Sequence, residues 1–235
     1  MIKNKEQNIK KQKRNENIYI LSIETSSSNC SVAISENNVI LSEYTIFKPN
    51  VHDRLLANLS KQILADLQIP ISKLNAVAVS SGPGSFTGLR VGASFSKGFC
   101  YDDSIKLIAV PTLSAIALFA KKDYYESLKY DRIIPIVKSH QDLYYYQIFD
   151  NTGEKITEII IDNFSNINKI INKNDLTVAS NNFKEKGINI EYLNKLNATF
   201  IAKYAYQKYI LNKFTDTNSF EPLYVQEFKI RDKKK

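Results

Sequence analysis

Short runs of apolar residues in the first 120 positions follow strand spacing and helix spacing in turn. Runs of this kind predict strands, and Asn37 and Asn38 between two of them predict a hairpin turn, because asparagine tolerates positive φ. In chain order we expect strands at 18–23, 30–35 and 39–47, a helix at 54–67, a strand at 75–80, a helix ending near 100, a strand at 106–110 and a helix at 112–120. Three antiparallel strands followed by alternating helices and strands predict a mixed sheet with helices on both faces.

The second half of the chain carries a shorter version of this mixed pattern. After a polar connector, we expect strands at 133–137, 143–149, 155–161 and 176–179 and helices at 164–171 and 199–214. The chain is therefore predicted to be an α/β protein with two mixed sheets. We assign an N-terminal domain to residues 18–121 and a smaller C-terminal domain to residues 122–228, between a basic extension at 1–17 and a basic tail at 229–235.

The net charge of +8 is concentrated at the two ends of the chain. Residues 1–17 and residues 229–235 each carry a net charge of +4, so the part between them is neutral. We expect both ends to be mobile. Such ends can bind phosphates non-specifically, although solvated ends of a lysine-rich sequence explain them equally well.

Composition excludes several classes of protein. Two cysteines, Cys30 and Cys100, exclude a disulfide scaffold and a cysteine-rich zinc module. No apolar run approaches the ~20 residues that a membrane span needs. The run at 18–23 is also shorter than the apolar core of about 7–15 residues in an export signal. We therefore expect a cytoplasmic protein without membrane contact.

Five of the seven glycines lie between positions 82 and 98, although glycine costs about 1 kcal/mol in a helix. Small residues recur at every fourth position there: Gly84, Gly88, Gly92, Ser96 and Cys100. Such a ridge lets another backbone approach closely. We assign the ridge to a tightly packed neighbouring helix, in this chain or in a partner. The bulky face of the same helix, with Val91, Phe95 and Phe99, is assigned to the sheet.

The familiar catalytic patterns do not occur in the sequence. His52 and His140 are its only histidines, and neither has the spacing of a zinc site. There is no Gly-x-Ser-x-Gly and no Gly-Lys-[Ser/Thr], although a glycine-rich turn before a helix is a generic anion site. Glu24 is the one carboxylate placed like a catalytic or metal-binding acid; the alternative is that Glu24 and Asn29 satisfy backbone donors of the turn. These observations indicate a binding or assembly subunit.

Two segments of the chain resemble the TsaB family. They are Ile20-Leu21-Ser22-Ile23-Glu24-Thr25-Ser26-Ser27-Ser28-Asn29-Cys30-Ser31-Val32-Ala33 and Ser81-Gly82-Pro83-Gly84-Ser85-Phe86-Thr87-Gly88-Leu89-Arg90-Val91-Gly92. The likeness covers about residues 18–120 and includes Val110-Pro111-Thr112-Leu113. It is weaker in the second half, where Lys138-Ser139-His140 and Pro222-Leu223-Tyr224-Val225-Gln226 replace the family's Asp-Ala-Arg-type and Pro-x-Tyr-Leu-Arg segments.

The resemblance implies an actin-like ATPase fold of two ribonuclease-H-like domains, the second abbreviated. It implies a non-catalytic subunit needed for the threonylcarbamoyladenosine (t6A) modification at position 37 of tRNA, paired with a TsaD-like catalytic subunit and joined by a TsaE-like ATPase, with tRNA bound through the complex. Thr25-Ser26 stands where the related TsaD proteins have an Asp-x-Gly phosphate hairpin. The resemblance therefore implies no cofactor of the chain's own, any nucleotide lying at the junction with TsaD. The alternative function is an active ATP-using enzyme of the actin-like class.

The resemblance also implies a surface for pairing. The helix at 54–67 and the glycine-rich helix of the first domain are the expected contact, and the same surface would serve a homodimer. The expected interface residues are Leu55, Leu59, Gly84, Phe86, Thr87, Gly88, Arg90, Gly92 and Ser96.

Overall fold

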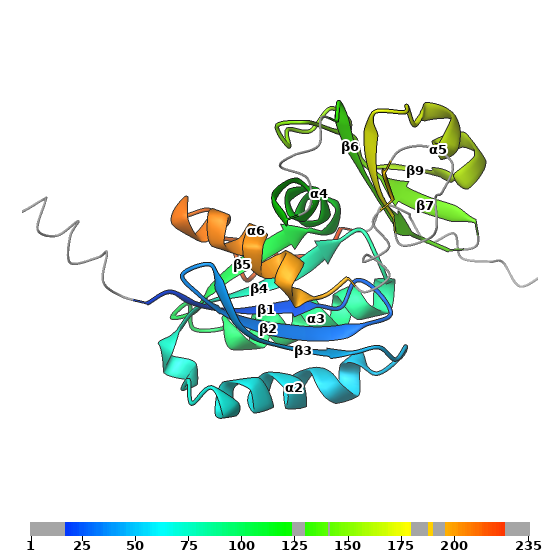
Figure 1. The fold of residues 1–235 in the computed structure, drawn as a ribbon. Coiled ribbons are helices and arrows are strands. Elements are labelled where there is room, and N and C mark those ends of the chain that lie inside the picture. The colour runs from blue at the N-terminus through cyan, green and yellow to red at the C-terminus, as the bar shows by residue number, and fades with distance from the viewer. Residues whose placement is uncertain (1–16, 124–129, 141, 180–187, 190–195, 224–235) are drawn as a thin grey trace, which may run out of the picture.

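The first sheet holds the N-terminal strands of the chain (Figure 1). The structure is a computed structural model that describes residues 17–123, 130–140, 142–179, 188–189 and 196–223. The strand order is β3-β2-β1-β4-β5, with bounds β1 Tyr19–Glu24, β2 Cys30–Glu36, β3 Val39–Ile46, β4 Leu74–Gly82 and β5 Lys106–Pro111. β1, β2 and β3 are antiparallel, whereas β1, β4 and β5 are parallel. The predicted hairpin turn is confirmed, since Asn37 and Asn38 have φ values of 47° and 72°.

Helices cover both faces of the first sheet. α2 (His52–Asp66) and α3 (Phe86–Phe99) pack on one face, and α4 (Thr112–Asp123) packs on the other (Figure 1). A single turn of 3₁₀ helix, η1 (Ile71–Lys73), leads into β4. The two faces follow from the alternation of side chains along a strand: Leu21 and Ile23 point toward α2 and α3, whereas Ile20 points toward α4.

The second sheet has the order β11-β10-β6-β7-β9, with β8 paired to β6. Its elements are β6 Arg132–Lys138, β7 Leu143–Tyr146, β8 Phe149–Asp150, β9 Ile160–Asn163, α5 Phe164–Ile170, β10 Asp175–Ala179 and β11 Ile188–Asn189. Arg132 donates to the buried Asp175 carboxylate from Nε at 3.0 Å and from Nη2 at 2.5 Å, which joins the parallel strands β6 and β10. The two mixed sheets confirm the expected α/β class.

The last helix, α6 (Ala198–Ile210), packs on the first sheet, although the predicted domain division placed it in the second domain. Its buried Phe200 and Ile201 share a core cluster with Ile20 of β1. The backbone N–H of Ala198 donates to the Ser31 hydroxyl of β2 at 2.9 Å. Helical periodicity identifies the inward face of a helix but carries no information about which sheet that face covers, which explains the difference.

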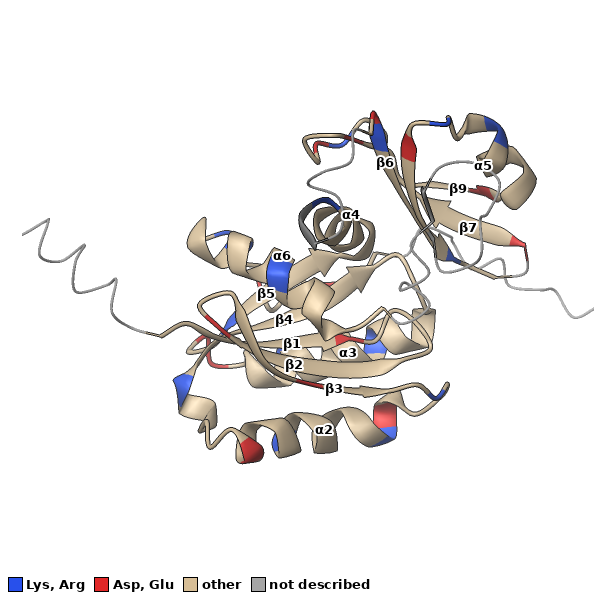
Figure 2. Cartoon of the chain, in the orientation of Figure 1, with Lys and Arg blue, Asp and Glu red and all other residues tan. Residues whose placement is uncertain are grey.

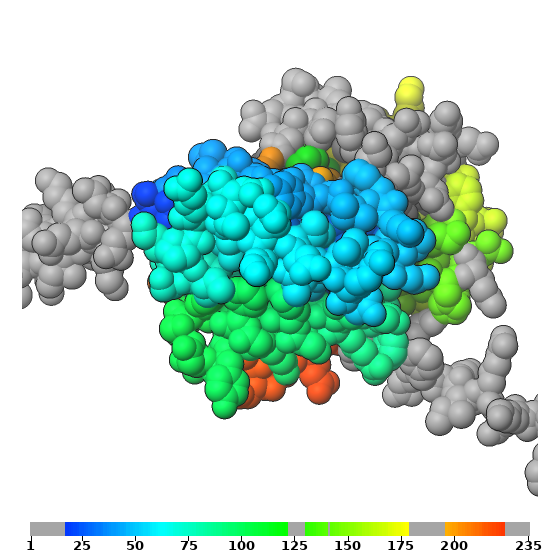
Figure 3. Space-filling model, turned by 90° about the horizontal axis from the view of Figure 1, so that it is seen from below, coloured from blue at the N-terminus to red at the C-terminus, as the bar shows by residue number. Residues whose placement is uncertain are grey.

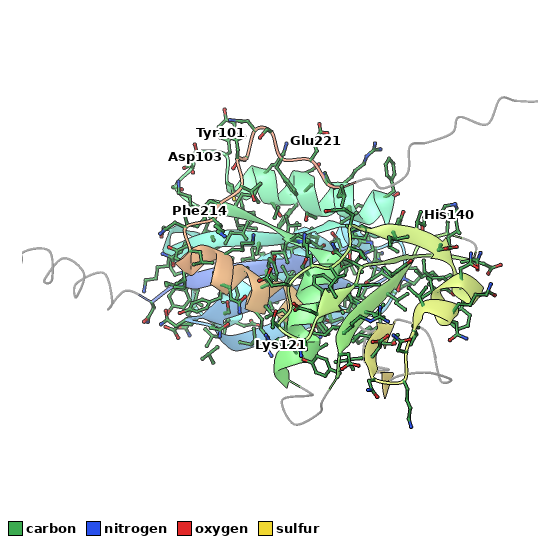
Figure 4. The ribbon with its side chains drawn as sticks, turned by 90° about the horizontal axis from the view of Figure 1, so that it is seen from above. Tyr101, Asp103, Lys121, His140, Phe214 and Glu221 are labelled. Atoms are coloured by element: carbon green, nitrogen blue, oxygen red, sulfur yellow. The ribbon has the colours of Figure 1, made fainter. Side chains whose placement is uncertain are left out.

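Residues 211–223 form a C-terminal strap along the edge of β5. The Thr215 N–H donates to the Leu107 carbonyl at 2.8 Å, and the Ala109 N–H donates to the Thr215 hydroxyl at 2.9 Å. Phe214, labelled in Figure 4, lies where the strap leaves α6. The strap satisfies backbone groups that an exposed edge strand would leave unpaired.

Acidic and basic residues are interspersed over the described chain. Figure 2 shows both signs on α2, which carries Asp53, Arg54, Lys61 and Asp66. The two basic ends cannot be placed, because residues 1–16 and 224–235 lie outside the described residues. Within the described part of the chain, no helix has both the length and the apolar character that a membrane crossing requires.

Candidate functional site

The small-residue ridge of α3 packs against the loop that joins β1 to β2. A Cβ atom added to Gly84 would lie 2.7 Å from Ser26 Cβ, and one added to Gly88 would collide with the Thr25 carbonyl oxygen. A Cβ atom on Gly92 would collide with the Thr25 hydroxyl and would lie 3.1 Å from Val79. The Ser85 N–H also donates to the Ser26 carbonyl at 2.6 Å. Glycine is therefore required because the chain's own loop lies against the helix.

This packing corrects the prediction that a neighbouring helix, in this chain or in a partner, packs on the ridge, because the chain's own β1–β2 loop lies there. Gly88, Gly92 and Ser96 are buried within the chain, and Gly84 is in contact with Ser26. The other expected interface residues remain accessible on α2 and α3: Leu55, Leu59 and Phe86 are half-buried, and Thr87 and Arg90 are exposed.

The bulky side chains of α3 lie against the core beneath α2 and α3 and are only partly buried. Val91, Phe95 and Phe99 are half-buried and lie at the margin of the core beneath the two helices. The rings of Phe95 and Phe99 are 5.1 Å apart. Figure 3 shows α2 and α3 next to each other on one face of the molecule. The sequence assigns these three side chains to the sheet, and they do pack against the core between the sheet and the two helices, although each keeps part of its surface accessible.

Positive charge adjoins this apolar face. The Arg90 guanidinium carbon lies 3.7 Å from the centre of the Phe86 ring, at the N-terminal end of α3. A cation over an aromatic ring is attracted by the electron-rich ring face. The surface formed by Leu55, Leu59, Val91, Phe95 and Phe99, with Phe86, Thr87 and Arg90 at one end, is called the α2/α3 face below.

Glu24 is fully buried at the carboxyl end of β1. Its carboxylate accepts hydrogen bonds from the Ser26 N–H and the Ser26 hydroxyl, both at 2.5 Å. Burial outweighs these bonds and raises the pKa of Glu24 from about 4.5 to about 7. The interpretation that Glu24 satisfies a backbone donor of the turn is thus confirmed.

Asn29 has a different contact from the predicted one. Its side-chain amide donates to the Leu196 carbonyl at 3.2 Å, just before α6. His52, in the first turn of α2, contacts the Asn29 carbonyl through Nε2 at 3.0 Å. Both residues therefore connect the β1–β2 loop to the helices around it.

The two cysteines are buried in the core between the first sheet and the helices α2 and α3. Burial raises the pKa of both the Cys30 and the Cys100 thiol to about 11. Neither thiol is ionised near neutral pH, so both cysteines act as small apolar side chains of the core. Among the described residues, no three His, Cys, Asp or Glu side chains are grouped as a metal site requires.

Two glycines of α3 provide a matched test of the ridge. We expect Gly92→Ala to lower the free energy of unfolding by about 3 kcal/mol, because the added methyl group collides with Thr25. A methyl group added to Gly98, on the same helix, would meet no neighbouring atom within 4 Å, so Gly98→Ala should raise stability by about 0.5 kcal/mol. Urea unfolding of both variants measures the difference, and equal effects would contradict the packing described.

The buried Glu24 carboxyl should make stability depend on pH. Its pKa is about 7 in the folded chain and near 4.5 when exposed, so between these values the folded state binds more protons. The wild type should therefore lose about 3 kcal/mol of stability, relative to Glu24→Gln, as the pH rises from 4.5 to 7. Urea unfolding across this range measures the difference; the exposed Glu158→Gln is the control. A constant difference between wild type and Glu24→Gln would refute the expectation.

Comparison with known proteins gives concordant matches. Residues 47–221 match the family of TsaD, tRNA N6-adenosine threonylcarbamoyltransferase. The tRNA threonylcarbamoyladenosine biosynthesis protein TsaB of Haemophilus influenzae is 24% identical over 228 residues, covering 90% of this chain and 94% of that protein. TsaB of Buchnera aphidicola subsp. Schizaphis graminum is 31% identical over 159 residues, covering 66% of this chain and 71% of that protein.

A solved structure agrees with the fold. A Pseudomonas aeruginosa protein, described as similar to the peptidase YeaZ, superposes with a TM-score of 0.75 at 17% identity. The superposition covers 89% of this chain and 100% of that one. Together with the extent of the sequence matches, these findings show that the chain belongs to the TsaB family, within the wider TsaD family.

Proposed function

We propose that this chain is a non-catalytic subunit in the t6A modification of tRNA, and that it supports a TsaD-related catalytic subunit by binding it. The relatives' names place them in threonylcarbamoyladenosine biosynthesis. The single observation that carries the pairing is the α2/α3 face, where aromatic and aliphatic side chains remain partly accessible on two adjacent helices. Contiguous apolar surface of this kind is typical of a protein–protein contact.

The geometry of the α2/α3 face suits helix-to-helix packing. α2 and α3 lie next to each other on one face of the molecule (Figure 3), so helices of a partner can pack across both of them. Phe95 and Phe99 would be central anchors, since aromatic side chains dominate interface energies. Arg90 and Thr87 would lie at the rim, where polar and charged groups are common.

The non-catalytic role is supported by the contents of the β1–β2 loop. Glu24, the one acid placed for chemistry, is turned onto Ser26 within its own loop. The backbone of α3 lies against the other side of this loop. Glu24 therefore stabilises the turn, and the proposal assigns catalysis to the partner.

Further parts of the proposal rest on the resemblance. A nucleotide would bind at the junction with the TsaD-related subunit, with no cofactor held by this chain alone. A TsaE-like ATPase would join the assembly, tRNA would be bound through the complex, and all of these would be cytoplasmic. A homodimer through the α2/α3 face would form when the partner is absent.

The alternative of an active ATP-using enzyme is tested by titrating the purified chain with Mg-ATP. We expect no measurable binding heat and no release of phosphate, because the proposal gives the chain no nucleotide site of its own. Isothermal titration and a phosphate-release assay provide the readouts. Tight binding with turnover by the chain alone would overturn the non-catalytic role.

Pairing is tested by co-purification with the TsaD-related protein of the same host. We expect Phe95→Asp to reduce the yield of complex at least tenfold, because it places a charge in the middle of an apolar contact. Ile156→Asp is the matched control, since Ile156 is 54% exposed on the second sheet's hairpin, away from α2 and α3.

Phe95 is half-buried, so a second variant separates pairing from folding. Thr87→Trp adds bulk at an exposed position of α3 and should also reduce co-purification while the melting temperature is unchanged. Complex formation by both variants at the wild-type yield would show that pairing occurs elsewhere.

A further inference from the structure

A cleft of about 550 Å³ lies between the two sheets, among α4, α6 and the hairpin that follows β8. It is on the face of the first sheet opposite α2 and α3. Leu118, Phe149 and Leu211 contribute apolar parts of its wall. The cleft is therefore separate from the α2/α3 face, and a ligand there would leave the proposed pairing surface free.

Four lysines line this cleft, with one acidic residue, Glu154. They are Lys121 at the end of α4, Lys155 in the hairpin, Lys208 in the last turn of α6, and Lys213 in the strap. Lys121 is labelled in Figure 4 and donates to the Thr152 carbonyl of the hairpin. The lining thus carries an excess of three positive charges, although the chain between its two ends is neutral.

The described acids do not neutralise these lysines. No carboxylate of the described residues lies within 4.0 Å of the ammonium group of any of these four lysines. The ion pair that the described residues do form, Arg132–Asp175, lies in the second sheet. Asp150, at the start of the hairpin, accepts instead from the N–H groups of Thr152 and Glu154. The hairpin's own turn therefore uses this aspartate.

The lysines are close enough to repel one another. Burial, followed by the charges of Lys213 and Lys155, lowers the pKa of Lys208. Lys121, Lys208 and Lys213 lie at the carboxyl ends of helices, where the helix dipole stabilises a cation. That effect does not account for Lys155, which reaches the same cleft from the second sheet. Convergence of cations from both sheets is the arrangement expected of an anion site.

We propose that this lysine-lined cleft binds phosphodiester groups of the tRNA. The proposal rests on the proposed function, which supplies tRNA as the substrate of the assembly. Lysine interacts with phosphate as a point charge without fixed geometry, which suits contact with an RNA backbone irrespective of sequence. The cleft then gives this chain a direct part in holding the substrate while the partner carries out the chemistry.

The test measures how tRNA binding depends on salt. Fluorescence anisotropy of a labelled tRNA transcript is recorded for the complex with the TsaD-related protein, and for the chain alone, at several salt concentrations. Each phosphate contact adds about 1 to the slope of log K against log salt. We expect Lys155→Gln combined with Lys208→Gln to reduce the magnitude of that slope by about 2.

The control removes the same charge elsewhere. Lys73→Gln combined with Lys169→Gln changes two exposed lysines on η1 and α5 and should leave the slope unchanged. Equal slopes for wild type and the cleft variant, or equal decreases in both double variants, would overturn the proposal. Phosphate groups could also come from a free polyphosphate, so the chain is titrated with tripolyphosphate as well. If the cleft variant loses tripolyphosphate binding but has the wild-type salt slope for tRNA, the cleft binds a free polyphosphate and the proposal of tRNA contact is overturned.

The experiments test the pairing with the TsaD-related protein and the RNA contact of the cleft separately. Absence of a complex in co-purification would overturn the proposed function, and the measurements on the chain alone would still decide the role of the cleft. A normal complex whose tRNA slope is insensitive to the cleft variant would overturn the cleft alone.

Discussion

The close approach of α3 to the β1–β2 loop determines much of this molecule. No methyl group fits where Gly84, in the turn before α3, meets Ser26, or where Gly88 and Gly92 of α3 meet Thr25, so all three positions require glycine. Since that face points inward, the face of α3 that points outward is the polar one with Thr87, Arg90 and Ser94, and Phe95 and Phe99 are partly buried beside it. The same contact encloses Glu24 and raises its pKa. A single steric constraint thus accounts for the orientation of α3, the sealed loop and the unusual carboxyl group.

The sequence predicts the elements well where the signal is local. The turn at Asn37 and Asn38 and the helix that begins near His52 depend on residues that are neighbours in the chain. The orientation of α3 could not be predicted in this way, because both its small face and its bulky face have helical spacing. The choice between them depends on Thr25, which is more than sixty positions away from Gly88. A helix with two apolar faces needs its tertiary neighbour before its inward side is known.

The candidate surfaces illustrate the same limit. Leu55 and Leu59 were identified from their spacing on one helix, and they remain accessible. The lysines of the cleft lie at positions from 121 to 213, and no window of sequence shows that Lys155 and Lys208 share a wall. The first sheet therefore separates two surfaces: an apolar one on α2 and α3, and a basic one beside α4 and α6. Proteins can bind two ligands at once when the two surfaces are on opposite sides.

The return of α6 to the first sheet has a consequence for biosynthesis. β1 emerges early from the ribosome, but Phe200 and Ile201, which cover Ile20, are made after the whole second sheet. Until α6 has been synthesised, α4 is the only helix of the described chain that covers this apolar side of the first sheet. A chain whose synthesis stopped between α4 and α6 would keep part of this apolar side exposed, where chaperones that recognise apolar segments could bind.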